Sequence, residues 1–188
     1  AFRIYRDEAM SKTHRAENLL GVLALLIGDE MNRLDVAAAP SGQTARAMLN
    51  AIAQYPNASI ELIRDAVALS HPAAVRAIAA LVEAGLVDKR PGADKRAVSL
   101  ALTPAGHAEM QRLRDAREQM LSRIAGRLDA HERATLEQLL IKILWHETRD
   151  PSHSMQLCRF CDDGPCIAAG CPVECRENGE PMPSGSAS

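Results

Sequence analysis

Residues 69–106 read LSHPAAVRAIAALVEAGLVDKRPGADKRAVSLALTPAG, and this stretch decides the fold. Its first half carries apolar residues at helical spacing, has a start signal in Ser70 before a proline, and stops at Gly85. In its second half, apolar side chains alternate with Ser or Ala from Val98 to Leu102, which is typical of a half-buried strand. Turn residues at 91–94 separate this strand from the short extended run that follows the helix. The sequence therefore predicts a helix followed directly by a β-hairpin.

A shorter helix precedes this unit. Asn57–Ser59 has the composition of a turn that ends in a helix cap, and Ile60, Ile63 and Val67 then share one helical face. Two helices and a hairpin in this order form a winged helix-turn-helix. In that motif the second helix enters a DNA major groove, and the tip of the hairpin, the wing, contacts the DNA backbone or minor groove. The predicted fold class is mainly α with a small β wing.

Longer helices flank the winged unit. The helix expected at about 15–36 is apolar around nearly its whole circumference, which in so small a protein indicates burial against a second copy. Thr103-Pro104 starts a long helix, and a D-x-x-E capping box at 129–132 starts a final helix with an apolar stripe along one side. We therefore predict a homodimer held together by a helical dimerisation arm.

Composition sets limits on the partners. The chain has 188 residues, of which 47% are hydrophobic and 3% aromatic, and its net charge is −2. A nearly neutral protein has no global attraction to nucleic acid, so DNA binding requires a local basic patch. The longest apolar run, Leu19–Ile27, is too short to span a bilayer, and the start is not a secretory signal. We expect a cytoplasmic protein that binds no membrane.

The basic residues fall where a winged helix needs them: on its second helix, on the first hairpin strand and at the hairpin tip. Each charge alone is typical of a solvated surface, and only their order and spacing indicate DNA binding. The predicted DNA-binding residues are Ser70, His71, Ala73, Arg76, Lys89, Arg90, Asp94, Lys95 and Arg96.

A set of motifs keeps its order and spacing across this region. These motifs are Leu69-Ser-His-Pro-Ala-Ala-Val-Arg76, Leu81-Val-Glu-Ala-Gly85-Leu-Val87, Lys89-Arg90, Asp94-Lys-Arg96 and Leu102-Thr-Pro-Ala-Gly106. In them the chain resembles the MarR (multiple antibiotic resistance regulator) family, over roughly residues 15–149. The resemblance implies an obligate homodimer on a pseudo-palindromic double-stranded operator. It also implies no enzymatic activity and a repressor or activator under ligand or redox control, of which we expect a repressor.

The resemblance carries residue roles as well. In the family the acid at the position of Asp94 typically orients the arginine at the position of Arg96 toward the minor groove. Many members have Ser or Thr where this chain has Val75, so one expected phosphate or base contact is missing. A small aromatic acid often binds between the arm and the winged domain of family members, which makes a small-molecule effector a further expected partner. The remaining candidates on the recognition helix are Ser70, His71 and Arg76.

All five cysteines lie near the C-terminus, in the pattern C-x2-C-x4-C-x4-C-x3-C. In a reducing cytoplasm such clustering indicates metal binding or redox chemistry rather than a disulfide scaffold. The first four match zinc-knuckle spacing with Cys166 in the histidine place, and Cys171-Pro172 is similar to the end of bacterial ferredoxin motifs. A smaller branch of MarR-like proteins carries a similar tail. The predicted ligands are Cys158, Cys161, Cys166 and Cys171, with Cys175 as an alternate.

Three states of this tail stay open: metal-free reactive thiols, a structural zinc ion and an iron–sulfur cluster. Four cysteines suit both Zn²⁺ and a cluster, and spacing does not discriminate between them. We favour the cluster, because a regulator needs an input and no other sensor residue is evident. The alternative function is a winged-helix protein-interaction module with a structural zinc arm, since a fold does not determine a function.

The predicted organisation has four parts. They are an N-terminal extension (1–11), a MarR-like body (12–150), a Cys-rich tail (151–177) and a disordered end (178–188). Within the body, the expected DNA-binding lobe covers about 43–106 and the expected dimerisation helices cover about 15–36 and 103–148.

Overall fold

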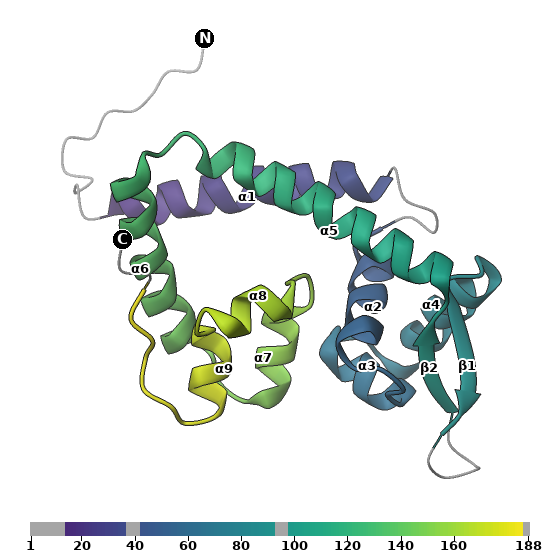
Figure 1. Cartoon of the computed structure of the whole chain (residues 1–188). Coiled ribbons are helices and arrows are strands. Elements are labelled where there is room, and N and C mark those ends of the chain that lie inside the picture. Colours follow the sequence, from purple (N-terminus) through teal and green to yellow (C-terminus); the bar gives the residue numbers. More distant parts are fainter. Residues whose placement is uncertain (1–13, 37–41, 93–97, 186–188) are drawn as a thin grey trace.

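The structure is a computed structural model that describes residues 14–36, 42–92 and 98–185. Its elements in chain order are α1 (Arg15–Val36), α2 (Gln43–Gln54), α3 (Ile60–Ala66), α4 (His71–Glu83), β1 (Val87–Pro91), β2 (Val98–Leu102), α5 (Pro104–Ala125), α6 (Ala130–Glu147), α7 (Pro151–Cys158), α8 (Asp163–Ala168) and α9 (Pro172–Glu177). In Figure 1, α1 runs beside α5, the lobe of α2–α4 and the hairpin lies at one end of α5, and α6 lies at the other. The predicted fold class, mainly α with a small β wing, is confirmed.

The hairpin follows the helix-turn-helix as predicted. β1 pairs with β2 in antiparallel register, from Val87 opposite Leu102 to Pro91 opposite Val98. An isolated bridge between Ser59 and Ser99 ties the hairpin to the start of α3. The lobe therefore holds the wing at a defined position relative to the two helices.

One hydrophobic core joins α2, α3, α4 and the hairpin. Apolar side chains from all four places meet there and exclude water, which is the main source of stability for so small a lobe. The largest fully buried side chains are Met48, Leu49, Ile52, Ile63, Ile78, Leu81, Val87 and Leu100.

The local start signals of the helices are mostly confirmed. Ser59 Oγ accepts a hydrogen bond from Leu62 N, and both halves of the capping box between Asp129 and Glu132 are formed. Thr103 Oγ1 accepts from Gly106 N at 3.0 Å. Ser70 occupies the N-cap position of α4, but its side chain makes no capping hydrogen bond, so that part of the prediction is wrong.

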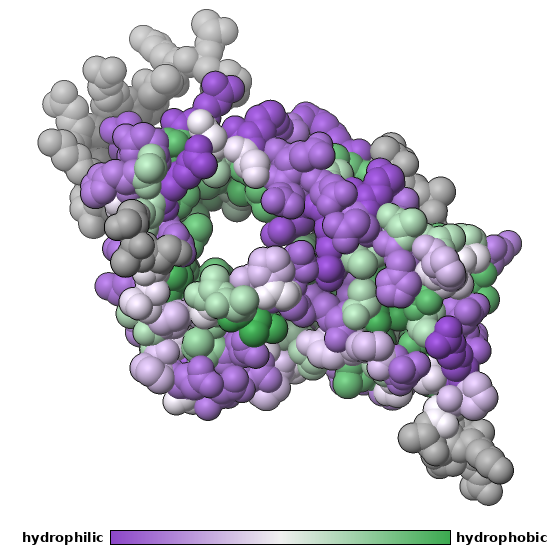
Figure 2. All heavy atoms as spheres, in the orientation of Figure 1, coloured by the Kyte–Doolittle hydropathy of each residue, from purple (hydrophilic) through white to green (hydrophobic). Residues whose placement is uncertain are grey.

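The arm helices leave apolar surface uncovered within one chain. On α1, the side chain of Leu25 is 71% exposed, and on α6, that of Leu139 is 55% exposed. Figure 2 shows an opening bounded by the region of α1 and α5, by α6 and by the tail helices, with hydrophobic residues along much of its edge. The exposed large apolar residues of the two helices are Leu19, Leu20, Val22, Leu23, Leu25, Leu26, Leu139, Leu140, Ile143 and Leu144.

The tail folds as three short helices between the arm and the lobe (Figure 1). α9 packs against α6, and α7 packs against α3 and α9. The break before Pro151 falls where it was predicted, with Asp150 Oδ1 accepting from His153 N to start α7. The tail thus touches both the arm and the lobe.

Some predicted features lie outside the described residues: the extension 1–11, the wing-tip residues Asp94, Lys95 and Arg96, and the last residues of the predicted disordered end. In residues 179–185, which are described, there is no helix or strand. Among the described residues, no single helix has the length and hydropathy to cross a membrane; only α3 and α4 taken together, bent by 105°, reach both.

Candidate nucleic-acid interface and thiol cluster

Helix α4 presents an exposed face opposite the core. Ala74, Ile78 and Leu81 are buried against the lobe, which fixes the orientation of the helix. The predicted contact residues His71 and Arg76 are therefore exposed. Ser70 is also exposed, Ala73 is half-buried, and Val75 adds an apolar side chain to the same face.

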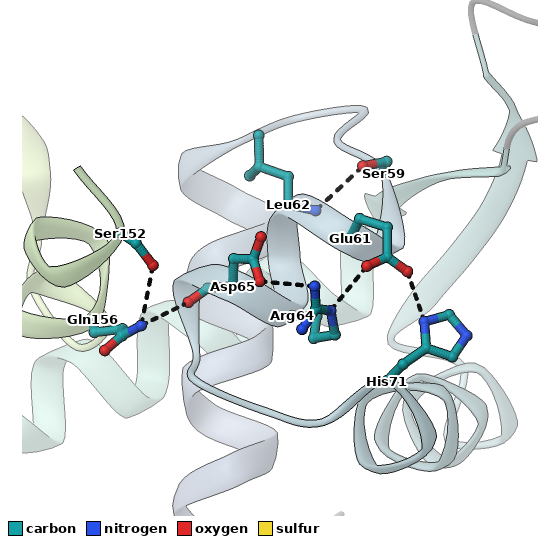
Figure 3. Close-up of polar contacts among 8 residues, drawn as sticks. All are labelled: Ser59, Glu61, Leu62, Arg64, Asp65, His71, Ser152 and Gln156. Atoms are coloured by element: carbon teal, nitrogen blue, oxygen red, sulfur yellow. Dashed lines mark hydrogen bonds and ion pairs between the residues drawn. The ribbon is translucent and has the colours of Figure 1, made fainter. Parts of the chain in front are cut away.

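A network of ionic contacts on α3 holds the start of α4 (Figure 3). Nδ1 of His71 lies 2.6 Å from a carboxylate oxygen of Glu61. The guanidinium of Arg64 donates to the other oxygen of Glu61 at 2.9 Å and pairs with Asp65 at 3.0 Å. The hydrogen bonds from His71 and Arg64 lower the pKa of Glu61. The imidazole of His71 is thereby oriented by the preceding helix.

The first strand of the wing adds two exposed cations. Lys89 and Arg90 lie on β1 with exposed side chains. Arg90 is 3.9 Å from a carboxylate oxygen of Asp88, a weak surface pair that leaves its charge available to a phosphate. α4 and β1 are in contact, so the strand that carries these cations lies beside the helix.

Comparison with known proteins finds a family match that covers this lobe. The MarR family profile matches residues 43–97, which run from α2 to the hairpin. The reduced form of MarR from E. coli is 27% identical, with a TM-score of 0.57 over 66% of this chain and 96% of that chain. Residues 43–97 thus match the MarR family, and the chain has the fold of MarR-family regulators.

More distant MarR-family structures share the fold. A MarR family protein from Bacillus stearothermophilus is 17% identical, with a TM-score of 0.65 over 75% of this chain and all of that chain (100%). MepR, a transcription regulator of the Staphylococcus aureus multidrug efflux pump MepA, is 14% identical, with a TM-score of 0.60 over 71% of this chain and 96% of that chain. No curated protein matches the chain. The profile match ends well before the cysteines.

The tail brings four of the five cysteines together. The thiol of Cys158 hydrogen-bonds with those of Cys161 and Cys171, and Cys171 also with Cys166. We call these four residues the thiol cluster. Cys175 stands apart, with Glu180 as its hydrogen-bond partner. The structure thus groups the four predicted ligands and separates the predicted alternate from them.

The hydrogen bonds within the thiol cluster shift the pKa values of its four cysteines in opposite directions. Hydrogen bonds from Cys158 and Cys166, with help from the backbone N–H groups of Glu174 and Val173, lower the pKa of Cys171 to about 2. A hydrogen bond from Cys158 lowers the pKa of Cys161 to about 7. The pKa values of Cys158 and Cys166 are raised, because these thiols act as the donors. The lowered pKa values belong to Cys161 and Cys171, the two thiols that accept these hydrogen bonds.

The thiol cluster lies at the wall of a cavity. Within the described part of the chain, no group of three or more His, Cys, Asp or Glu side chains is arranged to hold one metal ion. The four cysteines line one cavity of about 330 Å³, shared with Gln54 and Tyr55 from the lobe. Burial raises the pKa of Tyr55 and, to about 6, that of Asp163, which also lines the cavity.

Side-chain amides of α2 anchor the cysteine-bearing loop to the lobe. Asn50 Nδ2 donates to the carbonyl oxygens of Cys161 (2.9 Å) and Arg159 (3.2 Å). Gln54 Nε2 donates to the same Cys161 carbonyl at 3.3 Å and to Asp163 Oδ1 at 2.6 Å. The carbonyl of Cys161 is therefore held by two residues of one helix.

Arg114 of α5 adds a further link between the lobe and the cysteine-bearing loop. Its Nε donates to Asn50 Oδ1 at 2.8 Å, and another of its nitrogens pairs with Asp162 at 2.9 Å. Phe160 packs against the core of the lobe, with the guanidinium of Arg46 5.8 Å from its ring centroid. Burial of an aromatic ring and several polar contacts together fix the loop.

Sequence reasoning missed the residues that connect these parts. Glu61, Asn50, Gln54 and Arg114 carry no motif. The partners of Glu61, Arg64 and His71, are three and ten residues away, but those of the other three lie far away along the chain. A polar side chain such as Asn50 in a mostly apolar helix was the available signal, because a buried amide needs hydrogen-bond partners.

Proposed function

We propose that this protein is a dimeric transcription regulator, and more specifically a repressor, that binds a pseudo-palindromic double-stranded DNA operator in the cytoplasm. The observation that carries this proposal is the exposed face of α4 with His71 and Arg76, next to the basic strand β1 with Lys89 and Arg90. A helix with one buried and one exposed face, beside a cationic hairpin, suits a major groove flanked by phosphates.

In this surface, α4 would contact bases and β1 would contact phosphates. Arg76 and His71 on α4 can donate hydrogen bonds to base edges, and the methyl groups of Val75 can contact a thymine methyl. Lys89 and Arg90 offer charge to phosphates, which adds affinity without sequence preference. Because the whole chain is nearly neutral, binding depends on this local patch.

Dimerisation supplies the second half-site. The exposed leucines of α1 and α6 would lie in water in a single chain, and a contiguous apolar surface of that kind indicates an interface. The opening in Figure 2 has a hydrophobic edge, and helices of a second copy would pack against it. A two-fold pair places two α4 helices on successive major grooves, about 34 Å apart.

The tail adds a thiolate-bound centre, holding either an iron–sulfur cluster or Zn²⁺. Support comes from the grouping of four thiols, the set of soft ligands that both require. Bound to the tail, such a centre would supply the ordering free energy that its small apolar area lacks. The tail lies between α6 and the lobe, so the centre would adjoin both the proposed dimerisation helix and the proposed DNA-binding lobe.

The test is a gel shift and a fluorescence titration of the full chain with DNA from upstream of its own gene. We expect saturable binding by a dimer, protection of a pseudo-palindrome, and affinity that falls steeply with salt. Transcription from a reporter carrying that DNA should rise when the protein is absent. Equal, weak affinity for the upstream DNA and for scrambled DNA would refute the proposal and favour an interaction module.

A further inference from the structure

Glu61 and His71 bring a carboxylate of α3 against an imidazole of α4, at the proposed DNA-binding face (Figure 3). Nδ1 of His71 lies 2.6 Å from Oε1 of Glu61, the distance of a strong hydrogen bond to a charged acceptor. Both side chains are more than half exposed, at 58% for His71 and 56% for Glu61. One edge of the ring is therefore held by the protein, and the other is open to a partner.

The packing of the two helices fixes the separation of these side chains. Ile63 of α3 and Ala74 of α4 are fully buried, so neither helix can turn without opening the core. The second oxygen of the Glu61 carboxylate accepts from Arg64 Nε at 2.9 Å. An isolated surface pair is weak because both of its side chains move freely. Here the carboxylate is engaged at both oxygens, which restricts its motion.

The proton between the carboxylate and the ring belongs to the imidazole. The hydrogen bonds from His71 and Arg64 lower the pKa of Glu61, so its carboxylate is charged at neutral pH and can only accept. Nδ1 is then the donor. A neutral imidazole carries one proton, which leaves Nε2 as an acceptor. Figure 3 shows the second ring nitrogen pointing away from Glu61, and within the described residues it has no hydrogen-bond partner.

An acceptor at this place would select among bases. His71 is the first residue of α4, and the N-terminal residues of a recognition helix are those that contact base edges. In the major groove adenine and cytosine present an amino donor, whereas guanine presents only acceptors, and thymine an acceptor and a methyl group. Phosphate oxygens are acceptors as well, so Nε2 of a neutral ring gains no hydrogen bond from the backbone.

We propose that Glu61 is a positioning residue that sets the base preference of the regulator through His71. It keeps the ring proton on Nδ1, so that Nε2 of the neutral ring accepts a hydrogen bond from the amino group of an adenine or cytosine on the contacted strand. Only a second proton on the ring would turn Nε2 into a donor. The base preference rests on the proposed DNA-binding function, whereas the position of the ring proton does not.

The first experiment locates the ring proton. The full chain is labelled with isotopic histidine, and nitrogen NMR spectra are recorded at pH about 8, where an ordinary imidazole is neutral. The signals of the His71 ring are those missing in His71→Ala. We expect a protonated Nδ1 and an unprotonated Nε2 in the wild type. A proton on Nε2, alone or together with one on Nδ1, would overturn the proposal.

Glu61→Gln should move this proton. Arg64 still donates to the oxygen of the new side chain, which leaves its amide nitrogen to face Nδ1 of His71. That nitrogen is a donor, so Nδ1 becomes the acceptor and the ring proton shifts to Nε2. Nitrogen signals that stay as in the wild type would show that Glu61 does not hold the proton.

The second experiment measures base preference at the same pH. Affinities are determined for operators in which each base pair of one half-site is replaced in turn, and the position that His71 contacts is the one whose preference disappears in His71→Ala. There the wild type should favour adenine or cytosine by about 3- to 10-fold, the range of one net hydrogen bond. Glu61→Gln should reverse the order in favour of guanine or thymine, and the double variant should behave like His71→Ala.

A structural defect would not produce this pattern. Lower stability of Glu61→Gln would weaken binding to all operators alike, whereas a reversal at one position requires the His71 ring. Glu109→Gln is the matched control, because it also removes a carboxylate paired with an arginine three residues later, but on α5. It should leave both the nitrogen signals and the base preference unchanged.

The outcomes separate this inference from the proposed function. If His71→Ala alters no position, or if Glu61→Gln moves the proton but keeps the wild-type order of bases, the base contact is overturned. If the wild type binds the operator no better than scrambled DNA, the proposed function fails and the base preference fails with it. The nitrogen signals of the free protein still decide where the ring proton lies.

Discussion

The amide of Asn50 donates a hydrogen bond to the carbonyl oxygen of Cys161 at 2.9 Å, across 111 positions of sequence. Asn50 is buried in the lobe, 3% exposed, and its own carbonyl oxygen accepts from Arg114. One side chain therefore joins the DNA-binding lobe, the long helix α5 and the cysteine-bearing loop.

Replacement of this amide should loosen the tail. Asn50→Ala removes two donated bonds and one accepted bond, and it leaves buried partners unsatisfied, which costs about 1–3 kcal/mol of unfolding free energy. Hydrogen exchange should show faster amide exchange across 158–175. Gln111→Ala, which removes only an exposed pair with Asp115, is the control and should exchange like wild type. Unchanged exchange in Asn50→Ala would show that the contact does not hold the tail.

The apolar arm should govern assembly. Leu23→Glu on α1 or Leu140→Glu on α6 would place an unpaired carboxylate in the dimer interface, at a cost of about 3–5 kcal/mol. Dimerisation should weaken by more than about 100-fold, as measured by analytical ultracentrifugation at micromolar concentration. Gln111→Glu on the exposed side of α5 should remain dimeric. A wild-type protein that sediments as a stable monomer would refute the dimer.

Base contacts and phosphate contacts should respond differently. Arg76→Ala on α4 should weaken operator binding by about 1–3 kcal/mol and relax the sequence preference. Arg96→Ala should weaken binding to all sequences and lower the salt slope by about one unit. Arg133→Ala, on α6, should change neither. Unchanged affinity and salt slope in Arg96→Ala would remove the wing from DNA binding.

The start of α5 depends on a glycine. A Cβ on Gly106 would overlap the backbone carbonyl oxygen of Leu86, which also accepts a hydrogen bond from Thr103 N. Gly106→Ala should therefore lower the unfolding free energy by about 1–3 kcal/mol, as measured by urea denaturation. Gly164→Ala in α8 meets no atom within 4 Å and should be neutral or slightly stabilising. Equal stability of both variants would contradict the close approach of α5 to Leu86.

The Glu61–His71 contact predicts a pH dependence. The pKa of Glu61 in the folded protein is lowered, mainly by His71 and then by Arg64. A depressed carboxyl pKa contributes stability above the unfolded value, and this contribution is lost as the pH falls through the folded value. Glu61→Gln should therefore be less stable than wild type at neutral pH, and the difference should vanish in acid. Thermal melts at several pH values measure this, with Glu118→Gln as the control.

The sequence alone predicts the winged helix-turn-helix because that unit is local. The caps at Ser59, Thr103 and Asp129, the glycine stop at Gly85 and the alternation in β2 each act over a few residues. Interactions at such short range can be recognised from residue types and spacing. The apolar excess of α1 is visible in the same way, since a helix that is hydrophobic on every side needs partners on every side.

Only the tertiary structure decides how the tail meets the lobe. The spacing of the cysteines predicts that four thiols can gather, but it contains no information about α2, to which the loop is anchored. Asn50, Gln54 and Arg114 acquire their role from packing that brings residues 48 to 111 positions apart into contact. Hydrogen bonds across such separations depend on the docking of whole helices, and no local pattern encodes that. The cavity beside the thiol cluster has the same origin, because its walls come from both α2 and the tail.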